Sequence, residues 1–177
     1  YTQIVSNYGA YTSENKSDLK AKVKALKSAG CTAADYAMDL TKTLVDQSKT
    51  DANNNADRKN VKRVVIFFTD GEPNHQSGFD ESVANSAITS AKTIKADADI
   101  YTIGIFSGAD VSITGHSGSG LWSAKEKFNA FMHGLSSNYP DAETYKKLGT
   151  RAKDSKGQDA TYYKVATKAD ELKNIFT

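Results

Sequence analysis

The chain has 177 residues, which is enough for one domain with a sizeable hydrophobic core. Its 23 lysines and arginines stand against 21 acidic residues, and the resulting net charge of +2 excludes the strong basic excess typical of proteins that bind nucleic acid or anionic membranes. The single cysteine, Cys31, excludes an internal disulfide and a cysteine-based zinc site. The sequence shows no apolar run of membrane-spanning length and no signal peptide, as would also hold for a mature or excised fragment.

The first part of the chain predicts two helices. Ser17 is a candidate N-cap for a helix over residues 18–29, with Leu19, Val23 and Leu26 on one face and Gly30 as the stop. A second helix is predicted over residues 33–47. Its expected buried residues are Tyr36, Ala37, Leu40 and Leu44, and the polar residues 48–60 are expected to form a loop.

The most informative segment is residues 62–74, KRVVIFFTDGEPN. Its five apolar residues, 64–68, show no alternation, which is typical of a strand buried on both faces of a parallel sheet. Asp70 follows at the carboxyl end of this strand, where open α/β sheets bind their ligands. The alternative is that Asp70-Gly71 is only a tight turn.

The rest of the chain continues the alternation of strands and helices. The predicted elements are a helix over residues 80–96, a strand over 99–106, a Gly/Ser-rich loop over 107–120, a helix over 121–135, a turn over 136–140, a short helix over 142–152, a strand over 161–165 and a helix that begins at Lys168 after a Thr167 cap. This order predicts an α/β fold with a doubly wound, mostly parallel sheet flanked by helices.

Cysteine and histidine give no evidence of a catalytic or metal site. Cys31 lies between Gly30 and Thr32 and is expected to be buried, with no histidine base close in sequence. His75, His116 and His133 lack the spacing of metal ligands, and each is expected on a loop or a helix surface.

Several segments together resemble the von Willebrand factor type A domain family. They are Ile66-Phe67-Phe68-Thr69-Asp70-Gly71-Glu72-Pro73, the preceding Gly30-Cys31-Thr32, the following Ile100-Tyr101-Thr102-Ile103-Gly104-Ile105, and residues 163–176, which resemble the family's last strand and the start of its final helix. The resemblance covers nearly all of residues 1–177 and implies the Rossmann-like fold of that family. Phe131-Met132-His133 and Ser136-Ser137-Asn138-Tyr139-Pro140 resemble the version found in surface adhesins and pilus-tip proteins of Gram-positive bacteria.

The resemblance implies a metal-ion-dependent adhesion site. The family builds this site from an Asp-x-Ser-x-Ser after the first strand, a Thr, and an Asp, and Thr32 and Asp70 match the second and third elements. Oxygen ligands of this kind suit Mg²⁺ or another divalent cation, which then accepts a carboxylate from a partner protein. The alternative for Thr32 is a helix N-cap. Glu72, Asn74 and His75 follow Asp70 and are candidates for the rim that selects the partner.

The first element of the adhesion site has no match in the sequence. Asp110-Val111-Ser112-Ile113-Thr114 imitates it, but this segment follows the strand at residues 99–106 inside the Gly/Ser-rich loop. We therefore expect residues 1–177 to belong to a longer polypeptide, with the first strand and helix supplied upstream or by another chain. Ile4-Val5-Ser6 would then be what remains of the second strand, and the chain should not fold alone.

Two functional classes follow from the resemblance. The first is a non-enzymatic, extracellular adhesion domain on a cell wall or pilus, which binds a host or matrix protein through a magnesium-bridged carboxylate. The second is an intracellular type A domain that serves as an accessory subunit of an ATPase or chelatase-like complex. A hydrolase with Asp70 as nucleophile lacks a general-acid partner in the sequence, so we expect no enzymatic activity.

Overall fold

The computed structural model describes residues 12–27, 30–166, 171–172 and 175. Among these residues, the elements in chain order are α1 (Ser13–Lys24), α2 (Ala34–Asn54), the 3-10 helix η1 (Ala56–Arg58), β1 (Val64–Thr69), α3 (Glu81–Ile94), β2 (Asp99–Gly104), α4 (Ala124–Leu135) and β3 (Tyr163–Val165). No described helix is apolar over a length that would cross a membrane. The strand remnant expected at Ile4-Val5-Ser6 and the cap expected at Thr167 lie outside the described residues.

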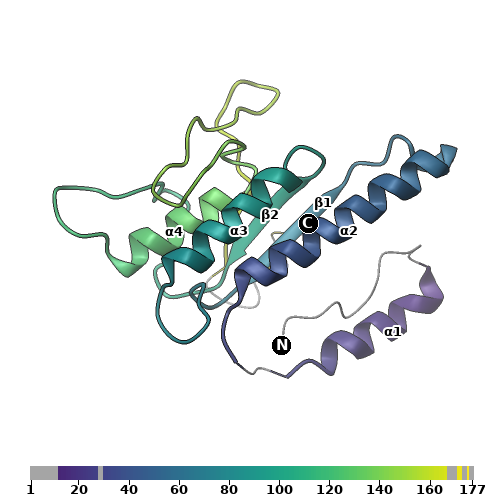
Figure 1. Cartoon of the computed structure of the whole chain (residues 1–177), viewed down its shortest axis with the longest axis horizontal. Coiled ribbons are helices and arrows are strands. Elements are labelled where there is room, and N and C mark those ends of the chain that lie inside the picture. Colours follow the sequence, from purple (N-terminus) through teal and green to yellow (C-terminus); the bar gives the residue numbers. More distant parts are fainter. Residues whose placement is uncertain (1–11, 28–29, 167–170, 173–174, 176–177) are drawn as a thin grey trace.

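The described strands form one parallel sheet in the order β1-β2-β3 (Figure 1). Val65 lies opposite Ile100, and Thr102 lies opposite both Phe67 and Tyr163. Helix α3 connects β1 to β2, and α4 lies in the connection from β2 to β3, so parallel strands alternate with helices as predicted. The predicted α/β fold is confirmed.

The two faces of the sheet differ in cover. Helices α2, α3 and α4 pack on one face, and its strand residues, among them Val65, Phe67 and Ile100, belong to the core or pack against it (Figure 1). On the opposite face Val64, Ile66 and Phe68 remain 50%, 52% and 51% exposed. The prediction that β1 is buried on both faces is therefore wrong for the described structure, because cover is present on one face only.

Helices α3 and α4 match their predictions closely. Asp80 caps α3, and its carboxylate accepts hydrogen bonds from the backbone of Ser82 and Val83. All five apolar residues predicted for the buried face of α3 are buried: Val83, Ala87, Ile88, Ala91 and Ile94. Ser123 caps α4 in a capping box with Glu126, and Phe128 and Phe131 enter the core as predicted.

The predictions for α1 and α2 are partly wrong. Thr12, not Ser17, caps α1, and Val23 and Leu26 are exposed, so this helix has no buried apolar face among the described residues. Helix α2 extends into the predicted loop as far as Asn54. Of the residues predicted to be buried on it, Tyr36 is exposed, and Ala37, Leu40 and Leu44 are only partly buried. The buried stripe of α2 is instead formed by Ala34, Met38, Val45, Ser48 and Ala52, because this is the side that packs against α3 and the sheet.

Two further predictions fail. Residues 142–152 do not form a helix but fold as turns with an isolated bridge between Thr144 and Lys147. Here tertiary contacts replace helical ones, since the Tyr145 amide donates to Asn85 Oδ1 over 3.3 Å and the Tyr145 ring is fully buried. Cys31 is exposed, and its Sγ donates to the Gln76 carbonyl oxygen over 3.4 Å.

The turn at residues 136–140 fastens α4 to the sheet. Ser137 pairs with β2, because its amide donates to Ile100 O and its hydroxyl accepts from Ile100 N, each over 2.9 Å. Asn138 Oδ1 accepts from the Tyr162 amide over 2.7 Å and so positions the residue before β3. His133 is fully buried beside this turn, which corrects the expectation of a helix-surface or loop residue.

Candidate functional site

Two loops meet beyond the carboxyl end of β1. One contains Cys31 and Thr32 before α2, and the other is the loop of residues 70–80 between β1 and α3. The Thr32 carbonyl accepts from the Asn74 amide over 2.9 Å and from the Ala34 amide over 2.8 Å, and the Cys31–Gln76 contact adds a second connection. The fold therefore brings together the two segments predicted to supply metal ligands.

Thr32 and the Asp70-Gly71 turn are in close contact. A Cβ atom placed on Gly71 would lie 2.7 Å from Thr32 Oγ1, so only glycine leaves room for the hydroxyl here. Buried Thr69 orders the turn, because its hydroxyl donates to Gly71 O over 2.9 Å and accepts from Gly71 N over 3.2 Å. Asp70 directly precedes Gly71 in the chain and is exposed.

The side-chain oxygens of Thr32 and Asp70 make no polar contact with other described residues. Among the described residues, the Thr32 hydroxyl and the Asp70 carboxylate have no hydrogen-bond or ion-pair partner. Thr32 is also not the cap of α2, since the N-cap is Ala33 and no side chain caps that helix end. The N-cap alternative for Thr32 is therefore wrong.

These oxygens suit part of a magnesium shell. Mg²⁺ prefers oxygen ligands, keeps several water molecules and is commonly held by one or two carboxylates. The described residues contain no group of three or more His, Cys, Asp or Glu side chains that could hold a metal. Thr32 and Asp70 would hold the ion together with water, which leaves coordination positions for an oxygen from outside the described residues.

The predicted rim residues occupy the same loop with different roles. The Asn74 side chain donates to Glu72 O over 2.8 Å and stabilises the loop. His75 is exposed, and its Nε2 lies 2.9 Å from Asp35 Oδ1. The His75 ring also stacks on Tyr36, with the ring centroids 4.8 Å apart.

Asp35 and Tyr36 contact His75, and the sequence did not predict them at this end of the sheet. Both lie in the first turn of α2, three and four residues after Thr32. The spacing of Tyr36 from Leu40 and Leu44 fits a helical apolar stripe and so predicts a buried residue, whereas Tyr36 is exposed. The signal that could have found them is their closeness to Thr32, since a helix that starts at a site displays its first turn there.

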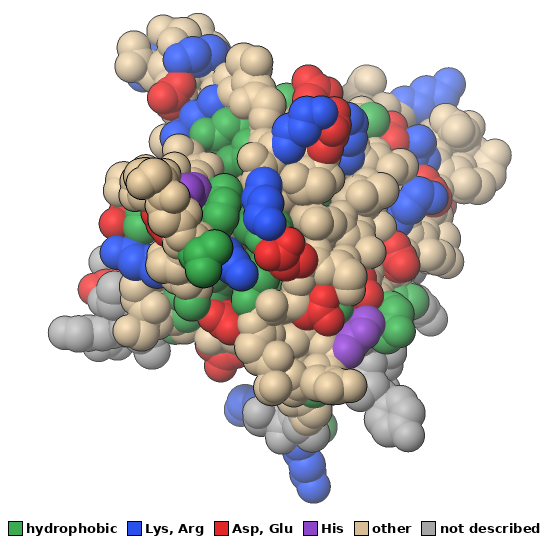
Figure 2. Space-filling view, turned by 60° about the vertical axis from the view of Figure 1, so that its left-hand side comes forward, with side chains coloured by type: hydrophobic (Ala, Val, Ile, Leu, Met, Phe, Trp, Pro, Cys, Tyr) green, Lys and Arg blue, Asp and Glu red, His purple; other side chains and the backbone are tan. Residues whose placement is uncertain are grey.

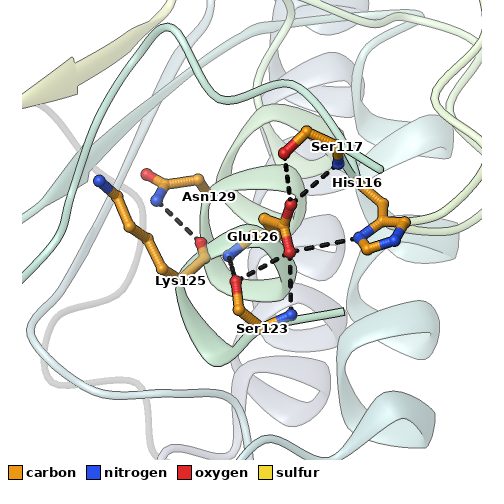
Figure 3. A network of polar contacts seen from close by, with 6 residues as sticks. All are labelled: His116, Ser117, Ser123, Lys125, Glu126 and Asn129. Atoms are coloured by element: carbon orange, nitrogen blue, oxygen red, sulfur yellow. Dashed lines mark hydrogen bonds and ion pairs between the residues drawn. The ribbon is translucent and has the colours of Figure 1, made fainter. Parts of the chain in front are cut away.

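A second polar cluster surrounds Glu126 on α4 (Figure 3). The carboxylate accepts from the backbone amides and hydroxyls of Ser117 and Ser123 over 2.8–2.9 Å, and His116 Nδ1 lies 3.2 Å away. These hydrogen bonds, those of the Ser117 and Ser123 amides first, lower the pKa of Glu126 well below its usual range. Sequence reasoning did not identify this cluster.

The Glu126 cluster is an anchor for the loop of residues 107–120, not a catalytic triad. Both serine hydroxyls contact the carboxylate, whereas a nucleophilic serine must contact the histidine that activates it. His116 Nε2 is buried and has no hydrogen-bond partner among the described residues, so it contacts no nucleophile there.

The segment of residues 110–114, which imitates the first adhesion-site element, uses its Asp110 carboxylate in hydrogen bonds within the segment. Asp110 Oδ1 accepts from the Ser112 amide over 2.9 Å and from the Ser112 hydroxyl over 2.6 Å. The Asp110 amide donates to Asn129 Oδ1 over 2.8 Å, which fixes this segment to α4. It lies in the connection after β2, as expected, and Asp110 serves as a turn residue.

Charges of both signs are interspersed over the surface seen in Figure 2, without a large basic face, in keeping with the net charge of +2.

A family model described as von Willebrand factor type A domain matches residues 1–177. Comparisons with curated proteins and with solved structures gave no match. The chain therefore belongs to the von Willebrand factor type A domain family, whose members mediate interactions between proteins.

Proposed function

We propose that this domain is an adhesion module that binds a carboxylate of a partner protein through a divalent cation, Mg²⁺ in the first instance, held at Thr32 and Asp70. The observation that carries the proposal is the contact between Thr32 and the Asp70-Gly71 turn, with both side-chain oxygens uncommitted among the described residues. When bound, the ion would supply an electrophilic centre for the partner's carboxylate.

The ligand set favours this use of the metal. One carboxylate and one hydroxyl leave most of the positive charge of Mg²⁺ uncompensated, so the ion retains a strong preference for another anionic oxygen. Asp70 is exposed, and the site opens to solvent beyond the end of β1. A protein partner can therefore approach, with Glu72, His75 and Tyr36 around the point of contact.

We further propose an extracellular location, on the cell wall or a pilus of a Gram-positive bacterium, with a host or matrix protein as partner. The support is the resemblance of residues 131–133 and 136–140 to the versions found in such surface proteins. In this structure residues 131–133 and 136–139 are buried and joined by hydrogen bonds between α4 and the turn after it, whereas Pro140 is exposed. They therefore belong to the scaffold and do not form the binding surface.

The test is adhesion of the full-length protein to immobilised collagen, fibronectin and laminin, with Mg²⁺ and with chelator. Binding should need Mg²⁺ and should fall at least tenfold in Asp70→Ala. Asp46→Ala is the matched control, because Asp46 is an exposed carboxylate on α2 that pairs only with Lys42 among the described residues. Binding that survives both chelator and Asp70→Ala would reject the metal-bridged mechanism.

A further inference from the structure

Residues 74–76, in the loop after β1, are joined to residues 31–36 at the start of α2 by a set of contacts that we call the loop clamp. Its members are Asn74 N to Thr32 O at 2.9 Å, Cys31 Sγ to Gln76 O at 3.4 Å, His75 Nε2 to Asp35 Oδ1 at 2.9 Å, and the stack of the His75 ring on Tyr36. Among the described residues, the hydrogen bonds that residues 74–76 make outside their own loop all go to residues 31–35. The clamp is therefore the connection of this part of the loop to the rest of the domain.

The pair of His75 and Asp35 is the polar contact of the clamp that side chains alone make. A carboxylate only accepts hydrogen bonds, so His75 Nε2 carries a proton and donates to Asp35 Oδ1. Only 13% of the Asp35 side chain and 37% of the His75 side chain are exposed, and the Tyr36 ring lies against the imidazole with the centroids 4.8 Å apart. The pair is thus shielded from water more than an ordinary surface pair and is held in one geometry.

The segment before α2 depends on the clamp for its position. Helix starts are commonly fixed by a capping side chain, but the N-cap of α2 is Ala33 and no side chain caps it. Ala34 is buried and holds the helix to the core, whereas Thr32 precedes the helix. The Thr32 carbonyl accepts from the Asn74 amide, so the clamp fixes Thr32 relative to the turn at Gly71.

We propose that Asp35 and His75 are positioning residues of the metal site: their contact holds the loop of residues 70–80 against the start of α2 and so keeps Thr32 and Asp70 together for one ion. This inference rests on the function proposed above. Neither Asp35 nor His75 is a ligand in it. Because the ion needs Thr32 and Asp70 at the same time, its apparent affinity falls with the fraction of molecules in which the two loops are docked.

A positioning role and a purely electrostatic role predict different results. If only the charge of Asp35 acted on the ion, Asp35→Ala and Asp35→Asn would weaken Mg²⁺ binding equally. His75→Ala would then not weaken it, since that change removes no negative charge. If the contact acts, His75→Ala weakens binding, and Asp35→Asn retains it because the asparagine oxygen still accepts from His75 Nε2.

Metal binding and docking of the loops are coupled in both directions. An ion that binds both Thr32 and Asp70 favours the docked loops, so Mg²⁺ should slow hydrogen exchange of the Asn74 amide, which donates to Thr32 O. The same exchange rate measured with chelator reports docking without any metal. The clamp and the metal site can therefore be tested separately.

The experiment measures exchange of the Asn74 amide with chelator, and Mg²⁺ affinity by calorimetry, in wild type and in variants of the pair. In Asp35→Ala and in His75→Ala we expect exchange about tenfold faster and Mg²⁺ affinity about tenfold weaker. Asp35→Asn should behave as wild type, as should Asp46→Ala elsewhere on α2. The double variant Asp35→Ala/His75→Ala should lose no more than either single variant. His75→Phe, which keeps a ring on Tyr36 but has no donor, serves if His75→Ala does not fold.

Unchanged Asn74 exchange and unchanged Mg²⁺ affinity in Asp35→Ala and His75→Ala would overturn the proposal. So would equal weakening of Mg²⁺ binding in Asp35→Ala and Asp35→Asn without an effect of His75→Ala, which would show that only charge acts. A wild type that binds no Mg²⁺ would instead reject the proposed function and the positioning role with it. Even then, the exchange rates with chelator would show whether the clamp holds the two loops together.

Discussion

The imidazole of His133 accepts a hydrogen bond from the side-chain amide of Asn138 over 3.0 Å, and both residues are fully buried. The other ring nitrogen, Nε2, donates to the Val111 carbonyl over 2.9 Å. Since Nδ1 accepts and Nε2 donates, the ring is neutral and both of its nitrogens are used. His133 therefore joins α4, the turn after it and the loop of residues 107–120.

This arrangement predicts loss of stability in mild acid. Burial lowers the pKa of His133 from 6.5 to about 4. The unfolded chain takes up a proton at His133 below pH 6.5, whereas the folded chain does so only near pH 4. The contribution of neutral His133 to the free energy of unfolding is therefore complete above pH 6.5 and is lost as the pH falls through 4. The loss amounts to about 3 kcal/mol.

Urea unfolding between pH 7 and pH 4 measures this effect. His133→Gln is the reference, because glutamine retains a donor and an acceptor but does not titrate in this range. The free energy of unfolding should fall more steeply with acid in wild type than in His133→Gln. Parallel pH profiles of the two proteins would contradict the assignment.

Substitutions of Asn129 and Tyr163 should have coupled effects on stability, because the two side chains share a buried hydrogen bond. Its Oδ1 accepts from the Tyr163 hydroxyl over 2.7 Å, and its Nδ2 donates to the carbonyls of Gly108 and Lys125. Asn129→Ala should cost about 3 kcal/mol because it leaves a buried hydroxyl unpaired. Tyr163→Phe should cost about 1 kcal/mol, and the double variant less than the sum, as denaturant titrations of all four proteins would show. Strict additivity would mean that the hydroxyl finds another partner.

Gly71→Ala tests the contact between the two loops of the candidate site. The new Cβ would lie 2.7 Å from Thr32 Oγ1, so we expect a loss of about 1–3 kcal/mol in thermal or urea unfolding. The loss should shrink in a Thr32→Ala background, where the clashing atom is gone. Gly115→Ala is the control, because nothing lies within 4 Å of its added Cβ. If Gly71→Ala lowers the free energy of unfolding equally in both backgrounds, Gly71 and Thr32 are not in contact, and the structure of the two loops is contradicted.

Glu126→Gln should loosen the loop of residues 107–120 without unfolding the domain. Glutamine keeps the size of the side chain but loses the charge that strengthens the hydrogen bonds from Ser117 and Ser123. Amide hydrogen exchange at Ser117 and Ser123 should speed up at least tenfold. Glu143→Gln, an exposed carboxylate that pairs with Lys147, should leave these amides unchanged. Unchanged exchange in Glu126→Gln would show that the loop is held by other contacts.

The sequence predicted best where local and tertiary signals agree. Helix α3 has a capping Asp80 and a continuous apolar stripe, and every predicted buried residue is buried. The pairing of Thr32 with the Asp70 loop was also foreseen, from the resemblance to a family motif. The contact of Thr32 with Gly71 now gives that pairing a physical basis.

The sequence predicted burial least well where tertiary packing decides which side of an element is covered. Tyr36 has the spacing of a core residue but is exposed beside His75, because α2 turns its Met38 and Val45 side toward α3 and the sheet. His133 was expected on a helix surface or a loop, since no local pattern reveals that the Gly/Ser-rich loop of residues 107–120 folds over α4. The uncovered face of β1 was likewise invisible, because an unbroken apolar run does not say which of its faces is covered.

The most direct test of the account is calorimetric titration of Mg²⁺ into wild type, Asp70→Asn and Asp46→Asn. Asn keeps the shape of Asp70 and removes only its charge, so the strand and the turn after it stay intact. We predict one site in wild type, the same affinity in Asp46→Asn, and at least a tenfold loss in Asp70→Asn. Equal Mg²⁺ affinity in all three proteins would contradict the assignment of the metal to Thr32 and Asp70.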